Sequence, residues 1–259
     1  KAAAPGDNFF QYANGTWFKN TEIPADRSRY TSFTLLVEKA ADREKAIIEE
    51  VAKDANASGE AAQIRDYYNA YMDDAKIESL GLKPIQPDLD RIAALADAKA
   101  LATELGGTLR ADVDIMNATN YYTPNLFGVW ISQSMADPQQ TVPYLMQGGL
   151  GLPDRSYYLD AGKDAADMRA AYQAHVEKIL TLAGDADAKG EAARVLALET
   201  SIAKVHATQE DTNDVKKGAN YWSRADLAAK APGMDWQAFL DAAQLGTQEQ
   251  FVVWQPGAT

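Results

Sequence analysis

The chain has 259 residues, of which 46% are hydrophobic and 24% are charged, values typical of a folded globular protein. Its formal net charge of -12 argues against a nucleic-acid partner, because phosphate backbones are bound by clustered Lys and Arg. Acidic residues interleave with basic ones, which indicates solvated helix faces. No apolar run reaches the roughly 18 residues of a membrane span, and the lack of cysteine excludes disulfides and thiolate zinc sites within these residues.

Two helices are predicted at the start of the chain. Asp7 can cap a short first helix, and the Asn-Gly pair at 14–15 predicts its end because it tolerates left-handed backbone. A longer helix follows, since apolar residues recur at intervals of three and four between positions 33 and 52. Asp26 or Ser28 can cap it. This spacing places the apolar side chains in one stripe along the helix.

Further helices are predicted along most of the remaining chain. One amphipathic pattern begins after Ser58, extends to Ala75 and is stopped by Gly81. Periodic patterns also predict helices at 88–95, 97–105, 164–183 and 186–207, with a short one after residue 235. No repeat of fixed period is present, which argues against a solenoid.

One stretch has strand character. Residues 126–131 combine β-branched and aromatic side chains, and an Asp-Pro turn at 137–138 leads to a second apolar run at 141–146. This pattern predicts a β-hairpin. Pro143 has no backbone donor, so its strand is expected at the edge of a sheet. The sequence thus predicts a mainly α fold with one small β-hairpin.

The last apolar run, residues 251–254, is followed by a Gln-Pro-Gly sequence. We expect this run to belong to an element that continues beyond the sequence. Its apolar surface should then be exposed in residues 1–259 alone.

Candidate catalytic residues are few. His175 and His206 lie on separate predicted helices, and no His-Glu-x-x-His occurs, so surface or capping roles are favoured over zinc ligation. The glycine cluster at 148–151 lacks the Gly-Lys-Ser/Thr ending of a phosphate loop and is interpreted as a turn. No Gly-x-Ser-x-Gly is present, and nothing favours a serine triad. The residues alone indicate a scaffold without an identifiable active site.

Three blocks stand out in chain order: PGDNFFQYANGTW (5–17) with IPADRSRYTSF (23–33), GLGLPDRSYYL (149–159), and the helix end HATQEDTND (206–214). In this order and spacing they resemble the amino-terminal part of the neprilysin and endothelin-converting-enzyme family of zinc metallopeptidases. The resemblance covers nearly the whole chain.

The resemblance implies a multi-helix cap-type domain that encloses substrate above a thermolysin-like catalytic part. Residues 1–40 are then expected to pack toward that absent catalytic part, and residues 41–259 to form the helical cap, truncated at its C-terminal end. In the family, zinc is held by the histidines of His-Glu-x-x-His and a later Glu, none of which is in this chain. The resemblance therefore implies a metallopeptidase whose catalytic residues lie outside residues 1–259, and this segment alone is expected to be inactive.

The resemblance also implies three substrate-binding residues. Arg29 matches an arginine that pairs with the substrate carboxylate, a role for which the guanidinium fork is suited. Phe33 matches a residue lining the pocket for the side chain after the scissile bond. Thr34 stands where neprilysin has Asp, and without that carboxylate a preference for a free substrate terminus is weakened, which favours cleavage within longer peptides.

The implied partners are oligopeptide substrates and the C-terminal catalytic part of the same protein. Animal relatives carry cysteine at the positions of Gly6 and Asn14, so the resemblance implies a bacterial protein, periplasmic or secreted after removal of its signal peptide. The alternative function is a stand-alone helical module that binds peptides or a protein without cutting them. A reading frame that continues beyond Thr259 to a His-Glu-x-x-His motif would favour the enzyme, and an immediate stop codon would favour the module.

Overall fold

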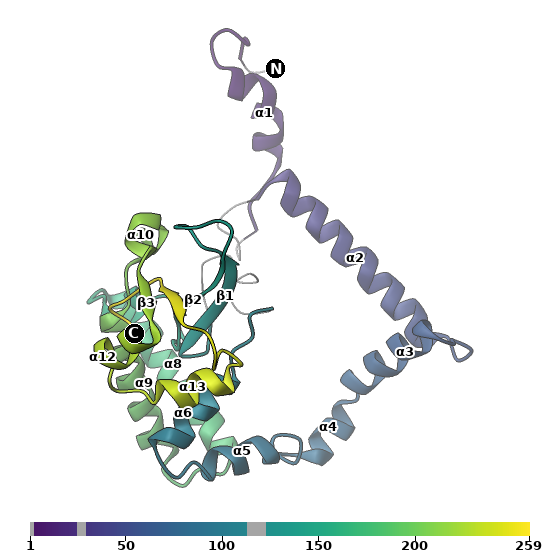
Figure 1. Ribbon diagram of the computed structural model, residues 1–259. Coiled ribbons are helices and arrows are strands. Elements are labelled where there is room, and N and C mark those ends of the chain that lie inside the picture. Colours follow the sequence, from purple (N-terminus) through teal and green to yellow (C-terminus); the bar gives the residue numbers. More distant parts are fainter. Residues whose placement is uncertain (1–2, 25–29, 113–122) are drawn as a thin grey trace. The chain divides into compact units, whose positions relative to one another are not determined.

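The computed structural model describes residues 3–24, 30–112 and 123–259 (Figure 1). The chain divides into two compact units, Lys1–Pro84 and Ile85–Thr259. The first unit contains four helices among its described residues: α1 (Phe9–Asn20), α2 (Ser32–Lys53), α3 (Glu60–Tyr71) and α4 (Asp74–Leu80).

Helix α1 is longer than predicted. Its N-cap is Asn8, whose side chain accepts a hydrogen bond from the first turn, and the expected cap Asp7 lies one residue earlier. The helix continues through the predicted stop at 14–15, because Gly15 keeps an ordinary helical backbone there. An Asn-Gly pair ends a helix only where the left-handed conformation is adopted.

The long predicted helix is present as α2, but it begins later than expected. Its N-cap is Thr31, which forms a capping box with Thr34, so neither Asp26 nor Ser28 caps it. These two residues lie outside the described part of the chain. The boundary expected at residue 40 falls within this continuous helix.

The apolar stripe of α2 is largely uncovered in the first half of the helix, and its last turns are only partly covered by α3. No residue of α2 is buried, and Phe33, Leu36 and Val37 are 78%, 63% and 68% exposed. On α1, Trp17 is also partly exposed, at 39%, rather than packed in a core. An amphipathic helix of this kind gains its stability from packing against a partner.

Helices α3 and α4 replace the single helix predicted between residues 58 and 75. Asp73 is the N-cap of α4, so a new helix begins there instead of a continuation of α3. Gly81, at φ +55°, ends α4 as predicted. Arg65 of α3 holds the end of α2: its Nη1 donates to the carbonyls of Asp54 and Ala55, each at 3.3 Å. This contact satisfies acceptors that follow the helix terminus.

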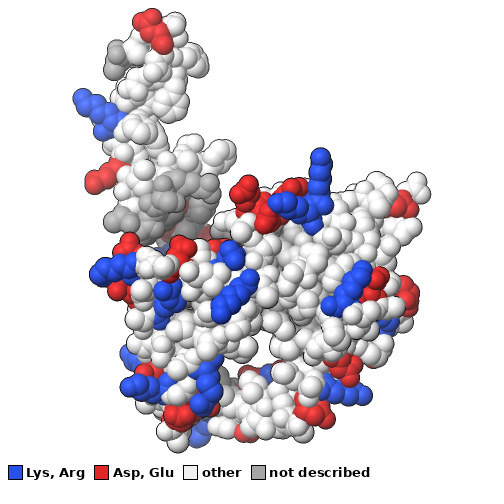
Figure 2. All heavy atoms as spheres, turned by 90° about the vertical axis from the view of Figure 1, so that its left-hand side faces the viewer, with Lys and Arg blue, Asp and Glu red and all other residues white. Residues whose placement is uncertain are grey.

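The second unit contains the sheet and the remaining described helices. Its elements are α5 (Gln86–Ala93), α6 (Ala98–Gly107), β1 (Phe127–Gln133), β2 (Thr141–Gln147), α7 (Arg155–Leu159), α8 (Lys163–Leu182), α9 (Ala188–Val205), α10 (Gln209–Asn213), α11 (Val215–Gly218), β3 (Tyr221–Ser223), α12 (Arg224–Lys230), α13 (Trp236–Ala242) and β4 (Gln250–Val253). The mainly α fold with a β-hairpin is confirmed. Figure 2 shows Lys and Arg interspersed with Asp and Glu over the face it presents.

The predicted hairpin is one half of a four-stranded sheet with the order β1-β2-β4-β3. Strands β1 and β2 are antiparallel, β4 runs parallel to β2, and β3 is antiparallel to β4. The expectation that Pro143 lies on an edge strand is wrong, because β2 is an interior strand. Pairing with β4 begins at Tyr144, so Pro143 precedes that ladder and its missing donor is tolerated.

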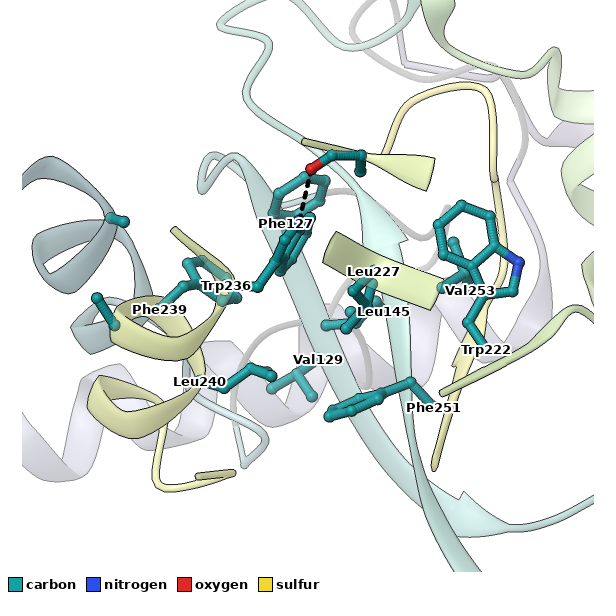
Figure 3. Packing of buried hydrophobic residues seen from close by; sticks show 13 residues of the cluster. Phe127, Val129, Leu145, Trp222, Leu227, Trp236, Phe239, Leu240, Phe251 and Val253 are labelled. Atoms are coloured by element: carbon teal, nitrogen blue, oxygen red, sulfur yellow. Dashed lines mark hydrogen bonds between the residues drawn. The ribbon is translucent and has the colours of Figure 1, made fainter. Parts of the chain in front are cut away.

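One face of the sheet forms the main core against α6, α12 and α13 (Figure 3). Alternate residues of each strand point to this face, including Val129, Leu145 and Phe251. Phe127 packs edge-on against Phe239 of α13, with ring centroids 5.9 Å apart. Fully burying a side chain of this size contributes about 1.5–3 kcal/mol relative to leaving it exposed.

The apolar run at 251–254 is not exposed, contrary to the sequence-based expectation. Phe251, Val252 and Val253 are fully buried in β4, and Trp254 is 8% exposed. Val252 and Trp254 pack on the second face of the sheet with Tyr144. The run therefore belongs to an interior strand of this unit, which pairs with β2, about a hundred residues earlier in the sequence.

Candidate functional site

The residues predicted to bind substrate lie near the start of α2. Arg29 is outside the described residues. Phe33 is 78% exposed, and the Thr34 hydroxyl is engaged in the capping box, where it accepts a hydrogen bond from the Thr31 backbone N–H at 3.2 Å. Thr34 thus has a local structural role at the helix start.

The two histidines occupy different environments. His175 is an exposed residue of α8, whereas His206 is the C-cap of α9 and its Nε2 lies 3.0 Å from the Gly148 carbonyl oxygen. Burial lowers the pKa of His206, an effect that the bond to Gly148 partly offsets. Across the described ranges no group of three or more His, Asp and Glu side chains is arranged to hold a metal ion.

The second and third sequence blocks come together in space. The side-chain amide of Gln147, just before the glycine cluster, donates to the Ala207 carbonyl and accepts from the Ala207 N–H, at 3.2 and 2.8 Å. Arg155 Nε donates to the Ala203 carbonyl on α9 at 3.3 Å. Together with the His206 contact, these bonds fasten residues 147–155 to the end of α9.

A cavity of about 240 Å³ lies where these segments meet. We name it the junction cavity. Its wall is formed by residues from four stretches of the chain: Thr123, Gln147, Gly148, Leu150, Pro153, Asp154, Arg155, Tyr157, His206, Ala207, Gln209 and Thr212.

A tyrosine–glutamate network holds the loop beside this cavity. Tyr158 Oη donates to Glu199 of α9 at 2.6 Å and accepts from the Leu152 N–H at 2.8 Å, while Tyr172 of α8 donates to the same carboxylate at 2.9 Å. Burial, followed by the bond to Glu199, raises the pKa of Tyr158. The phenol therefore remains protonated and serves as a donor.

Two glycines allow the close approach of chain segments around the cavity. A Cβ at Gly148 would collide with the Asn125 carbonyl, and one at Gly151 would collide with the Tyr172 hydroxyl. The prediction that this cluster serves as a turn agrees with these contacts. The junction cavity itself was not predicted, although the two blocks that form it were already visible in the sequence.

Residues 5–258 match the family described as peptidase family M13. The chain belongs to this family. The resemblance inferred from the three blocks is thereby confirmed.

Two animal M13 relatives illustrate the sequence similarity. Endothelin-converting enzyme 1 of Rattus norvegicus is 27% identical over 259 residues, covering 96% of this chain and 33% of its own length. The endothelin-converting enzyme homolog of Locusta migratoria is 26% identical, covering 98% of this chain and 36% of its own length. The chain thus spans about a third of the relatives it matches.

Solved structures are similar over nearly the whole chain. The crystal structure of the Mycobacterium tuberculosis zinc metalloprotease Zmp1 with an inhibitor has a TM-score of 0.77 and 30% identity, covering 99% of this chain and 38% of Zmp1. PepO from Lactobacillus rhamnosis, at 16% identity and a TM-score of 0.65, shares the fold. Within the described part, no helix is long and apolar enough to cross a membrane.

Proposed function

We propose that residues 1–259 form the substrate-enclosing, non-catalytic part of a zinc metallopeptidase that hydrolyses peptide bonds in oligopeptides. The match to peptidase family M13 over residues 5–258 carries this proposal. Zmp1, with which the chain shares 30% identity, is named a zinc metalloprotease. The catalytic part would be supplied by sequence beyond residue 259.

The residues described here do not fit a zinc site of their own. His206 is held against the Gly148 carbonyl, and His175 lies on a different helix. A catalytic zinc needs about three converging protein ligands and an open position for water. The zinc ligands, and the base that acts on zinc-bound water, are therefore assigned to the remainder of the protein.

The exposed apolar surface of the first unit supports the packing of residues 1–40 against the catalytic part. On α1, Phe9, Phe10 and Phe18 are each more than 60% exposed, and the stripe of α2 is equally open. Burying such surface stabilises an assembly by about 25 cal/mol per Å². In the full-length protein we expect Leu36→Lys to lower thermal stability more than Lys39→Leu; equal melting temperatures would contradict this packing.

Arg29 is proposed to pair with the carboxylate of a peptide substrate, and Phe33 to line the adjoining side-chain pocket. The exposure of Phe33 leaves its ring available for such a contact. Thr34 offers a hydroxyl that is already engaged by the helix cap, and it has no carboxylate to orient Arg29. Cleavage within longer peptides is accordingly proposed over strict removal of C-terminal dipeptides.

The decisive experiment compares the full-length protein with residues 1–259. Zinc content and cleavage of a fluorogenic oligopeptide would be measured for both. We expect about one zinc ion and peptide cleavage only in the full-length protein. Full-length protein that binds peptides without cutting them would instead identify the non-catalytic binding module.

The substrate-binding roles require a separate measurement. In the full-length enzyme, Arg29→Ala should raise KM about tenfold for peptides with a free carboxylate, as expected for loss of a charged hydrogen bond, and leave amidated peptides unchanged. Arg27→Ala is the matched control, and Thr34→Asp should increase the preference for free termini. Unchanged KM values for Arg29→Ala on both peptides would remove the assigned role.

The cellular site is proposed to be the periplasm or the exterior, on the basis of the family resemblance. Detection of the protein in the periplasmic fraction or the medium of its native cells, with its amino terminus processed, would support this location. Retention in the cytoplasm would contradict it.

A further inference from the structure

We propose that the junction cavity is a carboxylate-binding site and that the Arg155 guanidinium binds the ligand. Arg155 is a charged, directional donor fixed in the wall of a cavity that four stretches of the chain build together. The site lies in the second unit and involves neither Arg29 nor zinc.

The cavity is built by specific bonds rather than by loose loops. Gln147 and His206 connect the glycine cluster to residues after α9, and Tyr158 is tied to Glu199. At Thr212, another wall residue, the backbone carbonyl accepts a hydrogen bond from Trp254 Nε1 at 2.8 Å. The walls therefore have a defined geometry before any ligand arrives, which lowers the entropic cost of binding.

Arg155 is oriented by one hydrogen bond and has further N–H donors available for a ligand. Its Nε is used by the Ala203 carbonyl, which fixes the plane of the guanidinium. Its two Nη groups have no hydrogen-bond or ion-pair partner within the described ranges. A guanidinium edge with two parallel N–H donors matches the two oxygens of a carboxylate.

The remaining wall suits the carbon part of such a ligand. Leu150, Pro153, Tyr157 and Ala207 supply apolar surface beside the arginine. A short peptide end or an acidic side chain combines a carboxylate with carbon atoms in this way. A volume of about 240 Å³ can hold the atoms of a few residues at most, so a long peptide would not fit.

The local charges favour a monoanion over phosphate. Asp154 lies in the cavity wall, and Asp211 on α10 is already paired with Lys217, which lowers the pKa of that carboxyl. Asp214 and Glu210 also lie close enough to act on Lys217, so acidic groups outnumber Arg155 and Lys217 in this region. Arg155 can pair with one carboxylate, whereas a dianion would meet Asp154 and these other acidic groups with no further cation to balance its second charge.

The two histidines provide a direct readout of binding. His206 lines the cavity and His175 does not, and the sequence contains no other histidine. The ring signals of residues 1–259 would be followed by nuclear magnetic resonance during titration with four probes. These are N-acetyl-trialanine as the free acid, the same peptide amidated, amidated N-acetyl-Ala-Glu-Ala, and inorganic phosphate.

We expect the His206 signal to shift with a carboxylate probe while the His175 signal stays constant. A response to the free acid alone identifies a chain terminus as the ligand, a response to the Glu peptide alone identifies an acidic side chain, and a response to both identifies any accessible carboxylate. Equal shifts with the amidated trialanine, tighter binding of phosphate, or no shift with any probe would overturn the proposal.

Two substitutions test the role of Arg155. Arg155→Lys keeps the charge but loses the forked donor geometry, and it should weaken binding of the carboxylate probe at least about fivefold. Arg155→Gln should weaken this binding more. Arg194→Gln, at an exposed ion pair of α9 outside the cavity wall, is the control and should bind as the wild type does. A far-ultraviolet circular dichroism spectrum like that of the wild type shows that each variant is folded. Unchanged affinity in Arg155→Gln would overturn the assignment. The failure of this test would leave the proposed peptidase function untouched, since no cleavage is measured.

Discussion

The first and second units contain apolar residues in similar periodic patterns, but among the described residues only the second unit has buried apolar side chains. Four of the seven residues of α13 are buried, whereas α2, with 22 residues, has none. Periodicity predicts that a helix forms and which side is apolar. It does not tell whether the covering surface belongs to the same unit. The exposed stripe of α2 therefore indicates a partner surface outside its own unit.

The largest expected effect contrasts two leucines. Leu240 is fully buried in α13 and Leu36 is 63% exposed on α2. In residues 1–259, Leu240→Ala should lower the free energy of unfolding by about 2–5 kcal/mol, because it leaves a cavity in the core. Leu36→Ala should change it by less than about 0.5 kcal/mol. Denaturant unfolding of both variants measures the contrast, and equal losses would show that the stripe of α2 is covered within this chain.

The next effect concerns the close packing beside the junction cavity. Gly151→Ala places a Cβ against the Tyr172 hydroxyl and should cost about 1–3 kcal/mol of stability, the usual range for overpacking. Gly162→Ala is the control, since a Cβ there meets no atom within 4 Å. Thermal unfolding of Gly151→Ala with and without Tyr172→Phe measures the clash. If Gly151→Ala unfolds like Gly162→Ala, the loop does not pack on α8 as described.

A pH dependence of stability is expected from the burial of His206. Burial lowers the pKa of His206 below the ordinary value of 6.5, so the unfolded chain takes up this proton at higher pH than the folded protein. Stability contributed by neutral His206 is therefore lost as pH falls below that ordinary value. Between about pH 7.5 and about pH 5.5 the wild type should lose more stability than His206→Gln. An identical pH profile for the wild type and His206→Gln would contradict the assignment.

The smallest expected effect is local and lies in the first unit. Arg65→Gln removes three hydrogen bonds to carbonyls beyond the end of α2 and should destabilise that region only locally. Amide exchange in the last turn of α2 should accelerate, while its first turn, fixed by the Thr31 cap, should not change. Arg43→Gln, an exposed position of the same helix, is the control. Unchanged exchange at the last turn would show that Arg65 does not hold this end.

The sequence predicted local structure better than long-range pairing. The hairpin and the long helices α2, α8 and α9 follow from periods of two and of three to four residues, which are local properties. Strand β4 could not be assigned, because a run of four apolar residues is compatible with several structures until its partner β2 is known. The edge position expected for Pro143 failed for the same reason.

The candidate site was only partly predictable. The blocks at 149–159 and 206–214 were visible, but nothing local shows that Gln147 pairs with the backbone of Ala207. The role proposed for Arg155 depends on which of its nitrogen atoms binds the Ala203 carbonyl, and that contact forms only when α7 packs on α9 in the folded protein. For Arg29 the prediction stands as made, since it lies outside the described residues.

The position of β4 in the sheet also constrains how the protein is made on the ribosome. Strands β1 and β2 leave the exit tunnel early, yet the strand that lies between β2 and β3 is translated last of the four. The nascent hairpin must therefore wait, with its parallel-pairing side open, until residue 253 has emerged. The sheet of this unit can therefore be completed only after β4 has left the exit tunnel, whatever follows it in the sequence.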